Sequence, residues 1–333
     1  MTTGELPRIW FDRPLLPELA STIDAACTVL GPATDEDPYA GVEPAVAAVV
    51  GSMPYGEAFL DRAPGLQVIA RSGIGYDNID VAAATTRGIA VCNAPDGPTV
   101  STAEHAVTLM LAVAKRLVPS QTALRQGRAA GYYAGHDGIE LDGKVLGLVG
   151  FGRIARRVAR IAQGLGMDVV VVDQYLDDAA IPPDVSRVDS LAALLPIADV
   201  VSVHVPLTEA SAGMFDAARF AAMRRGAVFI NTARGGLVDQ EALLAALDAG
   251  QLAGAGLDVT TPEPLRPDHP LLGRDDVVVT PHIASATSEG KARILRIAFA
   301  QAMAVVEGRR PEHLLNPEVW DARAATAHVG GRA

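Results

Sequence analysis

The sequence predicts an α/β protein with two domains, each built on a parallel sheet, the second domain being inserted into the first. Three observations lead to this prediction. The chain has 333 residues, more than one ordinary hydrophobic core holds. Short apolar runs alternate with helical stretches in both halves, which is typical of parallel α/β units. Two long helical stretches, at residues 101–117 and 286–308, flank the second series of strands.

Three runs in the first hundred residues are predicted to be buried strands, because each is apolar and ends in Gly, Ser, Asn or Pro. They are "AAVVGS" (Ala47–Ser52), "LQVIARSG" (Leu66–Gly73) and "IAVCNAP" (Ile89–Pro95). Together with the helical segments between them, they indicate a small parallel α/β unit. The tail after Asp321 is small and polar, and we expect it to be frayed.

A long apolar helix is predicted to begin near Ser101. Ser101 followed by Glu104 fits a capping box, in which two side chains satisfy free N–H groups of the first helical turn. The helix is apolar on most faces, so we expect it to be buried inside a domain or at an interface. It should lead from the first unit into the second.

The second series of strands predicts a doubly wound sheet between residues 102 and 285. Its runs are rich in Val and Ile without alternation, as in parallel sheets that are covered on both faces. The predicted strands are residues 145–149, 168–173, 199–206, 226–233, 252–259 and 276–282. The apolar helix that follows is expected to pack back onto the first unit, which would make that unit discontinuous.

The segment "GLVGFGRIA" (Gly147–Ala155) carries a dinucleotide-binding pattern within the second series. A strand precedes it, a helix follows, and Asp173 closes the next strand about 20 residues on, which is the context the pattern requires. Gly150 permits a tight turn, Gly152 lets the backbone approach a pyrophosphate, and Ala155 is small enough for helix–strand packing. The alternative is a turn that contains these glycines by chance.

Asp173 also indicates which dinucleotide is bound. Its carboxylate would accept hydrogen bonds from ribose hydroxyls and repel a 2′-phosphate. The next residues, Gln174 and Tyr175, offer no cation to offset this repulsion. We therefore expect NAD rather than NADP.

Three polar side chains follow predicted strands at the sheet edge where ligands bind in open α/β sheets. They are Arg234 in "NTARGG", Glu263 in "TTPEP" and His282 in "TPHIAS". Arginine can hold a carboxylate by two hydrogen bonds, and histidine can exchange a proton with a ketone or alcohol oxygen. A glutamate bonded to that histidine would fix its tautomer and favour the imidazolium. With hydride supplied by nicotinamide, these residues predict interconversion of a 2-hydroxy acid and a 2-oxo acid.

Each of these residues also has a structural alternative. Arg234 could form a surface ion pair, Glu263 could be a turn carboxylate, and His282 could be an ordinary loop histidine. His204 also follows a strand, but we expect it to line the cofactor groove, and His105 to be a packing residue or a minor cleft contact. No cluster of His, Cys, Asp and Glu has metal-ligand spacing, so no metal is predicted.

Composition and charge exclude several other classes of protein. The net charge of −11 argues against nucleic-acid binding, which needs a basic stripe. No apolar run approaches the roughly 18 residues of a membrane span, and the N-terminus lacks the pattern of a signal peptide. Cys27 and Cys92 are far apart and suggest neither a disulfide scaffold nor a metal site. We expect a cytoplasmic protein with no membrane or nucleic-acid partner.

The motifs together resemble a known family. With "RSGIGYDNID" (71–80), "NTARGGLVDQEAL" (231–243) and "GLDVTTPEPL" (256–265), the chain is similar over nearly its whole length to the D-isomer-specific 2-hydroxyacid dehydrogenases. Within the family it is similar to the D-3-phosphoglycerate dehydrogenase and hydroxypyruvate/glyoxylate reductase branches. The resemblance implies a Rossmann NAD domain (102–285) inserted in a smaller flavodoxin-like α/β substrate domain (1–101 and 286–333). It also implies a homodimer.

The resemblance implies a role for each matching residue. Arg234 would bind substrate, and Glu263 and His282 would form the acid–base pair. The loop expected to bind the substrate carboxylate through backbone N–H groups comprises Ser72, Gly73, Ile74 and Gly75, with Arg71 placed to reach a phosphate. Cofactor contacts carry over to Thr102, Gly150, Gly152, Arg153, Ile154, Asp173, His204, Pro206, Thr232, Ala233 and Asp258, the last orienting the nicotinamide carboxamide. "TTPEP" departs from the usual acidic-aromatic lead-in, so Glu263 is assigned by its spacing from Arg234 and by the proline after it.

Three functions follow from these expectations. The first is an NAD-dependent D-2-hydroxyacid dehydrogenase that resembles phosphoglycerate dehydrogenase. The alternative is a glyoxylate/hydroxypyruvate reductase, and Arg71 does not decide between them, because arginine there also suits acids without a phosphate. The third is a non-catalytic, NAD(H)-sensing protein like the corepressor relatives of the family, which the acidic charge disfavours.

Overall fold

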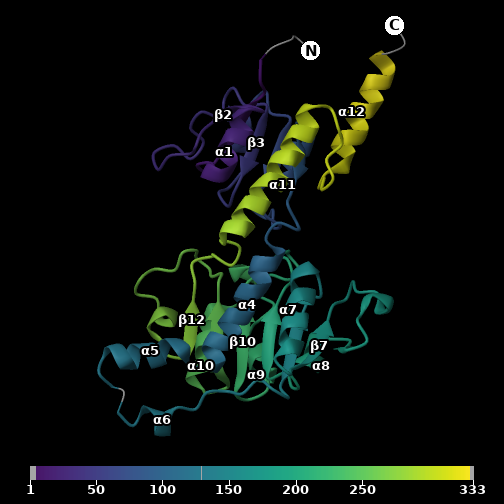
Figure 1. The fold of residues 1–333 in the computed structure, drawn as a ribbon. Helices are drawn as coiled ribbons and strands as arrows, with labels where there is room; N and C mark the ends of the chain where they lie inside the picture. The colour runs from purple at the N-terminus through teal and green to yellow at the C-terminus, as the bar shows by residue number, and fades with distance from the viewer. Residues whose placement is uncertain (1–4, 129, 331–333) are drawn as a thin grey trace. The chain divides into compact units, whose positions relative to one another are not determined.

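The chain folds into two compact units, seen in a computed structural model that describes residues 5–128 and 130–330 (Figure 1). The first unit comprises the described parts of 1–98 and 287–333, and the second comprises 99–286. The first boundary falls after Pro98 rather than after Ser101, and the second falls after Ala286 rather than after Ser285. Within the described residues, none of the helices has both the length and the hydropathy of a membrane span.

The sheet of the first unit is parallel throughout, in the strand order β2-β1-β3-β4-β5. This is the flavodoxin-like order, as expected. Its strands are β1 (Arg8–Phe11), β2 (Thr28–Leu30), β3 (Ala47–Val50), β4 (Val68–Arg71) and β5 (Ala90–Cys92). The sequence analysis missed β1 and β2, because runs of four and three residues are too short to show a reliable pattern.

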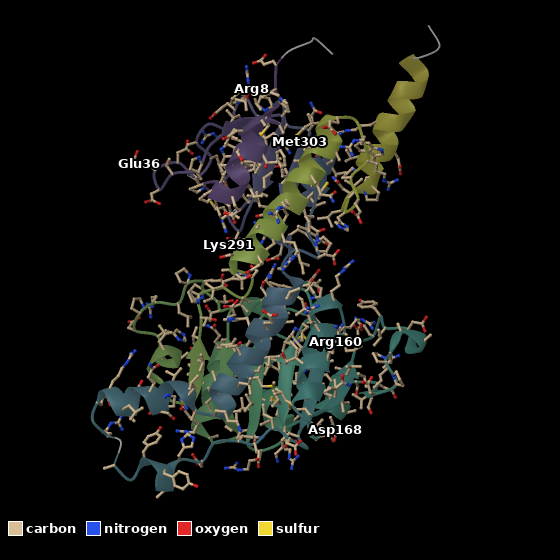
Figure 2. The ribbon with its side chains drawn as sticks, in the orientation of Figure 1. Arg8, Glu36, Arg160, Asp168, Lys291 and Met303 are labelled. Atoms are coloured by element: carbon tan, nitrogen blue, oxygen red, sulfur yellow. The ribbon has the colours of Figure 1, made fainter. Side chains whose placement is uncertain are left out.

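Helices cover both faces of this sheet. On one face, α1 (Pro17–Asp24) and α11 (Ser288–Val306) pack on residues such as Ile9 and Val49. On the other face, α2 (Glu57–Arg62) and α3 (Val81–Thr86) pack on the alternate residues. Figure 1 shows α11 crossing the sheet, and Met303 of this helix, labelled in Figure 2, packs against the core. The helix after residue 286 therefore does return to the first unit.

The chain end is attached to β5 by a buried asparagine. Asn316 Oδ1 accepts the N–H of Val91 at 2.8 Å, and its Nδ2 donates to the carbonyl of Ile89 at 2.9 Å. After it, α12 (Pro317–Gly330) is a helix, so the expectation of a frayed tail after Asp321 was wrong for residues 322–330. The Arg323 guanidinium donates to the carbonyls of Gln67 and Gly88 and so anchors this helix. The composition of the tail does not reveal these contacts.

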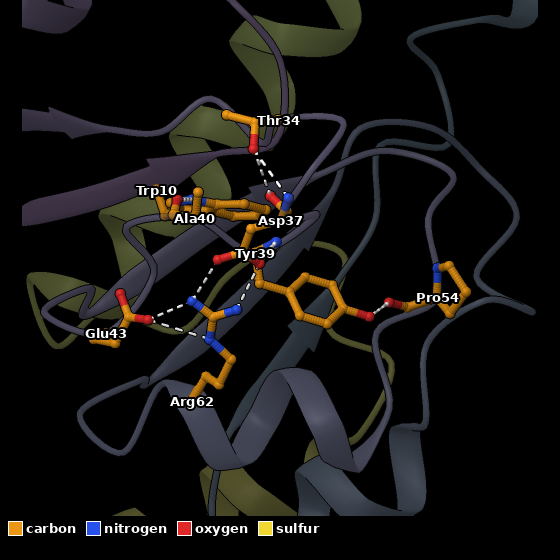
Figure 3. Close-up of polar contacts among 8 residues, drawn as sticks. All are labelled: Trp10, Thr34, Asp37, Tyr39, Ala40, Glu43, Pro54 and Arg62. Atoms are coloured by element: carbon orange, nitrogen blue, oxygen red, sulfur yellow. Dashed lines mark hydrogen bonds and ion pairs between the residues drawn. The ribbon is translucent and has the colours of Figure 1, made fainter.

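The loop between β2 and β3 is ordered by one arginine (Figure 3). Arg62 on α2 donates to both carboxylate oxygens of Asp37, at 2.6 and 2.9 Å, and also bonds Glu43. The hydrogen bond from Arg62 lowers the pKa of Asp37 below its usual value. Tyr39 reaches from the same loop to the carbonyl of Pro54 at 2.6 Å. These contacts hold the loop in place and are not part of the candidate active site.

The sheet of the second unit is also parallel throughout, in the order β12-β11-β10-β9-β6-β7-β8. The order reverses between β6 and β9, as in a Rossmann fold, and this switch point is where dinucleotides bind. The strands are β6 (Val145–Val149), β7 (Asp168–Val172), β8 (Val185–Arg187), β9 (Val200–Val203), β10 (Ala227–Asn231), β11 (Leu252–Leu257) and β12 (Val277–Val279).

Both faces of this second sheet are buried, which explains its continuous apolar runs. In β10, Val228 and Ile230 face one core, whereas Ala227 and Phe229 face the other. The helices are α4 (Thr99–Ala114), α5 (Leu117–Arg125), α6 (Tyr132–Gly135), α7 (Arg153–Gly164), α8 (Leu191–Leu194), α9 (Ala217–Ala222) and α10 (Gln240–Asp248). Helices α4 and α7 share the first face, and α8, α9 and α10 share the second. The exposed side of α7 carries arginines, among them Arg160 (Figure 2).

Helix α4 begins earlier than the capping pattern predicts. It starts at Thr99, so Ser101 is a buried residue within the helix rather than its cap. Its apolar residues face β10, β11 and α7 inside the unit, which leaves little of the helix for contact with another chain. It ends at Ala114, and Arg116 then adopts a left-handed backbone conformation before α5 begins.

Candidate active site

The glycine turn after β6 lies at the switch point of the second sheet. Gly150 has φ +87°, and a side-chain carbon there would lie 2.9 Å from the carbonyl oxygen of His204, so the turn requires glycine. Beside Gly152 the space is open, with no described atom within 4 Å of where a side-chain carbon would be. Helix α7 starts at the next residue without a side-chain cap. A helix that begins beside open space in this way suits the binding of a pyrophosphate.

Asp173 is held rigidly beside this turn. Its Oδ2 accepts the N–H of Phe151 at 2.9 Å, and its Oδ1 accepts the N–H of Tyr175 at 2.9 Å. Each carboxylate oxygen retains capacity for a further hydrogen bond. The carboxylate is thus fixed at the position where ribose hydroxyls are bound in this type of fold.

His204, which follows β9, lacks the surroundings of an acid–base catalyst. Burial lowers its pKa to about 4, so the ring is neutral at physiological pH. The ring Nε2 shares a hydrogen bond of 2.9 Å with the hydroxyl of Ser202. The residue lies against the glycine turn, and its position suits a wall of the cofactor groove.

The residue after β10, Thr232, carries a buried hydroxyl group. The Oγ1 of Thr232 is buried and has no hydrogen-bond partner in the described part of the chain. A buried hydroxyl without a partner is costly, and a bound polar ligand would satisfy it. Thr232 is one of the residues expected to contact NAD, so this orphaned atom and the open space beside Gly152 both fit a bound dinucleotide.

The turn that carries Arg234 is built around Asn231, which is fully buried. Asn231 Oδ1 accepts the N–H of Ala233 at 2.9 Å, and its Nδ2 donates to the carbonyl of Arg234 at 2.9 Å. The next residue, Gly235, lies so close to the carbonyl of Thr260 that a side chain would not fit. The sequence "NTARGG" therefore fixes the backbone from which the guanidinium extends.

The loop after β11 that carries Glu263 is held by Gln240, the first residue of α10. Gln240 Oε1 accepts the N–H of Thr261 at 2.9 Å, and its Nε2 donates to the carbonyl of the same residue. The hydroxyl of Thr260 donates to the carbonyl of Pro262 at 3.0 Å. These contacts position the carboxylate of Glu263 at the strand end.

Glu263 and His282 meet at the end of the second sheet. His282 Nδ1 lies 2.5 Å from Glu263 Oε1, and both side chains are about one-third exposed. Because Nδ1 is engaged by the carboxylate, the other ring nitrogen, Nε2, is the one left for another partner. Arg234 follows β10, the neighbour of β11 in the sheet, so all three residues expected to be catalytic follow adjacent strands.

Asp258, expected to contact the cofactor, lies beneath this pair and is 1% exposed. Its Oδ1 accepts the hydroxyl of Thr280 at 2.6 Å and the N–H of Ile283 at 2.8 Å, and its Oδ2 accepts the N–H of Ala284 at 2.8 Å. Burial opposes ionisation, but these hydrogen bonds and one from His105 outweigh it, so the pKa of Asp258 is below its usual value. Oδ2 accepts only one of these bonds and retains one acceptor position.

Several contributors to the site were missed by sequence reasoning. Asn231, Gln240 and Thr280 act by holding backbone, and nothing in their spacing distinguishes them from ordinary polar residues. His105 was expected to make packing or minor cleft contacts, yet it bonds Thr280 at 2.9 Å. The sequence signal that could have pointed to this contact was the position of His105 on the apolar face of a predicted helix.

The remaining residues expected to contact the cofactor lie on α7, on α4 and after β9. Arg153 and Ile154 open α7, Thr102 is buried in α4, and Pro206 closes the segment after β9. The Pro206 carbonyl accepts the hydroxyl of Ser211 at 2.8 Å.

The expected substrate loop lies in the first unit, after β4. The N–H of Ser72 donates to Val50 at 2.7 Å and that of Gly73 to Arg71 at 2.9 Å, so both are already used. The Asn93 side chain donates to the carbonyl of Ile74 at 2.8 Å and orients the next peptide. If this loop binds a carboxylate, the N–H groups of Ile74 and Gly75 are the better candidates. The guanidinium of Arg71 folds over Gly73, where a side-chain carbon would collide with it.

One surface depression of the second unit lies away from these strand ends. A depression of about 260 Å³ is lined by Arg116, Arg128 and His136, and it lies near the start of β12, at the opposite edge of the sheet. Among residues 5–128 and 130–330, no group of three or more His, Cys, Asp or Glu side chains gathers as metal ligands would.

Comparison with known proteins agrees with this geometry. Residues 107–284, more than half of the chain, match the profile of the D-isomer specific 2-hydroxyacid dehydrogenase family, NAD binding domain. The chain belongs to this family. The cofactor of the second unit is therefore NAD, in keeping with the glycine turn and Asp173.

Within this family, the chain is similar both to D-3-phosphoglycerate dehydrogenases and to glyoxylate reductases. A D-3-phosphoglycerate dehydrogenase of Archaeoglobus fulgidus is 39% identical over 77% of this chain and 48% of its own length. A glyoxylate reductase of Korarchaeum cryptofilum is 41% identical over 81% of this chain and 82% of its own. The chain thus spans about half the length of the first relative and four-fifths of the second.

The same fold is found in solved structures. A Thermus thermophilus protein superposes with a TM-score of 0.85 and 39% identity, over 92% of this chain and 99% of that one. The match covers both units, including the flavodoxin-like sheet that lies outside the matched NAD-binding profile.

Proposed function

We propose that this chain is an NAD-dependent D-2-hydroxyacid dehydrogenase that interconverts a small 2-hydroxy acid and its 2-oxo acid. The observation that carries the proposal is the contact between His282 and Glu263, 2.5 Å apart, in a sheet whose switch point fits a dinucleotide. Bound NAD(H) would supply or accept the hydride. The chain would supply binding, orientation and the proton.

His282 would exchange the proton. With Nδ1 engaged by Glu263, its Nε2 would donate to the oxygen of a 2-oxo acid during reduction and accept from the hydroxyl during oxidation. The carboxylate of Glu263 would stabilise the imidazolium, as an ion pair at short distance does. The pair is partly exposed, which gives a substrate access to the ring.

Arg234 would bind the substrate carboxylate. A guanidinium offers two parallel donors to a carboxylate and can also polarise the adjacent carbonyl. In the first unit, the N–H groups of Ile74 and Gly75 offer a second binding site for the same kind of group, beside Arg71. We propose that this loop takes part in substrate binding.

The cofactor contacts are assigned to the turn and the strand ends. Gly150, Gly152 and the first residues of α7 would hold the pyrophosphate, and Asp173 would hold the ribose. Thr232 would gain a partner for its buried hydroxyl. Because the carboxylate of Asp173 is fixed by two backbone N–H groups, we expect NADH to be strongly preferred over NADPH.

The substrate is proposed to resemble that of phosphoglycerate dehydrogenases, with a glyoxylate or hydroxypyruvate reductase as the second candidate. The second candidate is favoured by the more complete match to the glyoxylate reductase relative. A purely NAD(H)-sensing protein, like the corepressor relatives of the family, is the least favoured function, because the net charge of −11 does not suit a corepressor.

Initial rates decide among these functions. NADH oxidation would be followed with glyoxylate, hydroxypyruvate, phosphohydroxypyruvate, pyruvate and bulkier 2-oxo acids, and each would be repeated with NADPH. We expect turnover with at least one small 2-oxo acid. NADH binding without turnover on any of them would contradict the dehydrogenase proposal and support a sensor.

We also propose that the protein is a cytoplasmic homodimer. Helices α5 and α6 expose large apolar side chains, which suit an interface better than solvent. These are Leu117, Val118, Leu124 and Tyr133, with exposed fractions of 60%, 48%, 65% and 96%. Light scattering after size exclusion tests the dimer, and Leu124→Glu should shift it toward monomer. The free, buried thiols of Cys27 and Cys92 suit a reducing compartment.

A further inference from the structure

Helix α4 lies unusually close to strand β11, because the strand carries glycines where the helix crosses it. A side-chain carbon at Gly254 would lie 2.7 Å from Val113 Cγ1, and one at Gly256 would lie 2.9 Å from Leu109 Cβ. Val113 and Leu109 are one turn apart on the helix, and alternate residues of the strand share one face. Continuing both periods by one step places His105 against Asp258.

The side chains confirm this register. His105 Nε2 lies 2.9 Å from the hydroxyl oxygen of Thr280 and 3.4 Å from Asp258 Oδ1. The Thr280 hydroxyl donates its own proton to Asp258 Oδ1, at 2.6 Å. The hydroxyl oxygen can therefore only accept from the ring, so Nε2 of His105 carries a proton and donates it. His105 is 18% exposed in its side chain, and Asp258 is fully covered.

The network surrounds the segment that carries His282. Asp258 accepts the N–H groups of Ile283 and Ala284 through its carboxylate, and that of His282 through its backbone carbonyl at 2.8 Å. Thr280 accepts the same His282 N–H at 3.0 Å. The backbone of the segment from 280 to 284 is thus held by Asp258, through both its carboxylate and its backbone carbonyl.

The segment needs such support, because His282 adopts a backbone conformation that is unfavourable for a residue with a side chain. Its φ is +52°, in the left-handed region. Residues other than glycine rarely adopt this region unless surrounding contacts enforce it. The direction of the His282 ring toward Glu263 depends on that conformation.

We propose that His105 is a positioning residue for His282, acting through Thr280 and Asp258. The inference rests on the proposed function, in which His282 exchanges the proton. His105 touches neither Glu263 nor His282 in the contacts above; it donates to the pair of acceptors that hold the His282 backbone. Without its N–H, Thr280 and Asp258 lose a shared donor, and the loop gains freedom to leave the productive geometry.

The first test compares His105→Leu with His105→Gln. Leucine removes the donor and keeps much of the volume, whereas glutamine places an amide N–H near the former Nε2. We expect His105→Leu to lower kcat for 2-oxo acid reduction by about tenfold to 100-fold, up to the loss that a misplacement of about 1 Å causes. The KM of the acid and the Kd of NADH should change less than about threefold, and His105→Gln should restore most of kcat.

His269→Leu is the matched control. It is another half-buried histidine of the second unit, and its Nδ1 accepts the N–H of Leu271 at 3.3 Å, away from the Asp258 network. This variant should keep the kcat of the wild type. Thermal unfolding of all variants shows whether a loss of rate accompanies a loss of the folded state.

The deciding measurement combines His105→Leu with His282→Ala. If His105 acts through His282, its removal costs nothing further once the His282 ring is gone, so the double variant and His282→Ala should have equal rates. A general structural role would lower the rate by the same factor in both backgrounds, and that result would overturn the proposal. An unchanged kcat in His105→Leu would overturn it as well. If the wild type reduces no 2-oxo acid at all, the proposed function fails instead, and the two failures are distinguished.

Discussion

Two histidines follow parallel strands of the same sheet, yet their surroundings give them opposite properties. His204, after β9, has a hydroxyl partner, and burial lowers its pKa to about 4. His282, after β12, has a carboxylate 2.5 Å from its ring and about one-third of its side chain exposed. A strand end places a histidine near a ligand. Whether it can exchange a proton depends on its charged partner and on its access to substrate.

The comparison also explains what holds each ring. His204 is fixed by the crowded glycine turn, whose Gly150 approaches its backbone carbonyl. His282 instead lies on a segment held from below by Asp258 and Thr280. His204 thus suits the wall of the cofactor groove, whereas His282 lies on a segment that other residues hold in place. The following substitutions test that difference, beginning with the largest expected effect.

His282→Ala should remove the proton donor and leave the cofactor site intact. We expect kcat to fall by about 10²- to 10⁴-fold, the usual contribution of general acid–base catalysis. NADH fluorescence titration should show binding close to that of the wild type. Lost NADH binding together with unchanged turnover per binding-competent site would reverse the roles given to the two histidines.

Arg234→Lys should show that geometry matters as well as charge at the end of β10, which lies between β9 and β12 in the sheet. Lysine keeps the positive charge but cannot offer two parallel donors to a carboxylate. We expect kcat/KM for the 2-oxo acid to fall by about tenfold to 100-fold, corresponding to about 1.4 to 2.8 kcal/mol of lost transition-state binding. Steady-state kinetics measure this, and near-normal values would argue against two-pronged binding.

Asp173→Ala tests the residue that is proposed to select NADH over NADPH. Loss of a hydrogen bond to a charged group and of the repulsion toward a 2′-phosphate should lower the preference for NADH over NADPH by about tenfold or more. The ratio of kcat/KM values for the two cofactors measures the effect. An unchanged ratio would refute the ribose contact.

His204→Gln should have the smallest effect on rate and a distinct effect on stability. The folded-state pKa of His204 is below the unfolded value, so the unfolded chain binds a proton that the folded chain does not. Stability should therefore fall as pH drops from about 6.5 toward 4, by at most about 3 kcal/mol from this group. Urea unfolding at several pH values measures the slope.

Glutamine at this position should flatten that part of the slope, and kcat should change by no more than a few-fold. An identical pH dependence in the variant would show that His204 is not the neutral, buried group described above. A loss of rate as large as that of His282→Ala would remove the distinction between the two residues.

Much of the second unit could be predicted because its elements obey local rules. The glycine turn, Asp173 and the strand-end positions of Arg234, Glu263 and His282 follow from strand length, turn chemistry and the sheet rule. The strands other than β8 were expected within a few residues of where they lie, since each is a continuous apolar run. Strand β8, a run of three residues, was missed because it is too short to show a pattern. The start of α4 was misplaced, because the Ser101 pattern mimics a cap inside a helix.

The residues that support the site could not be predicted in the same way. Asn231 and Gln240 act through backbone groups that are distant or unremarkable in sequence. His105 reaches Asp258 only because Gly254 and Gly256 let a helix approach a strand closely, which is a tertiary property. In the first unit, β1 and β2 are too short to be seen, and the use of the Ser72 and Gly73 N–H groups depends on how the loop folds.

The central claim is that His282, and not His204, exchanges the proton with the substrate. The most direct test is the pH dependence of kcat/KM in both reaction directions, for the wild type, His282→Ala and His204→Gln. The account predicts that reduction slows as pH rises and oxidation slows as pH falls, in the wild type and in His204→Gln, and that these opposite limbs disappear in His282→Ala. Limbs that persist in His282→Ala, or that vanish in His204→Gln, would contradict it.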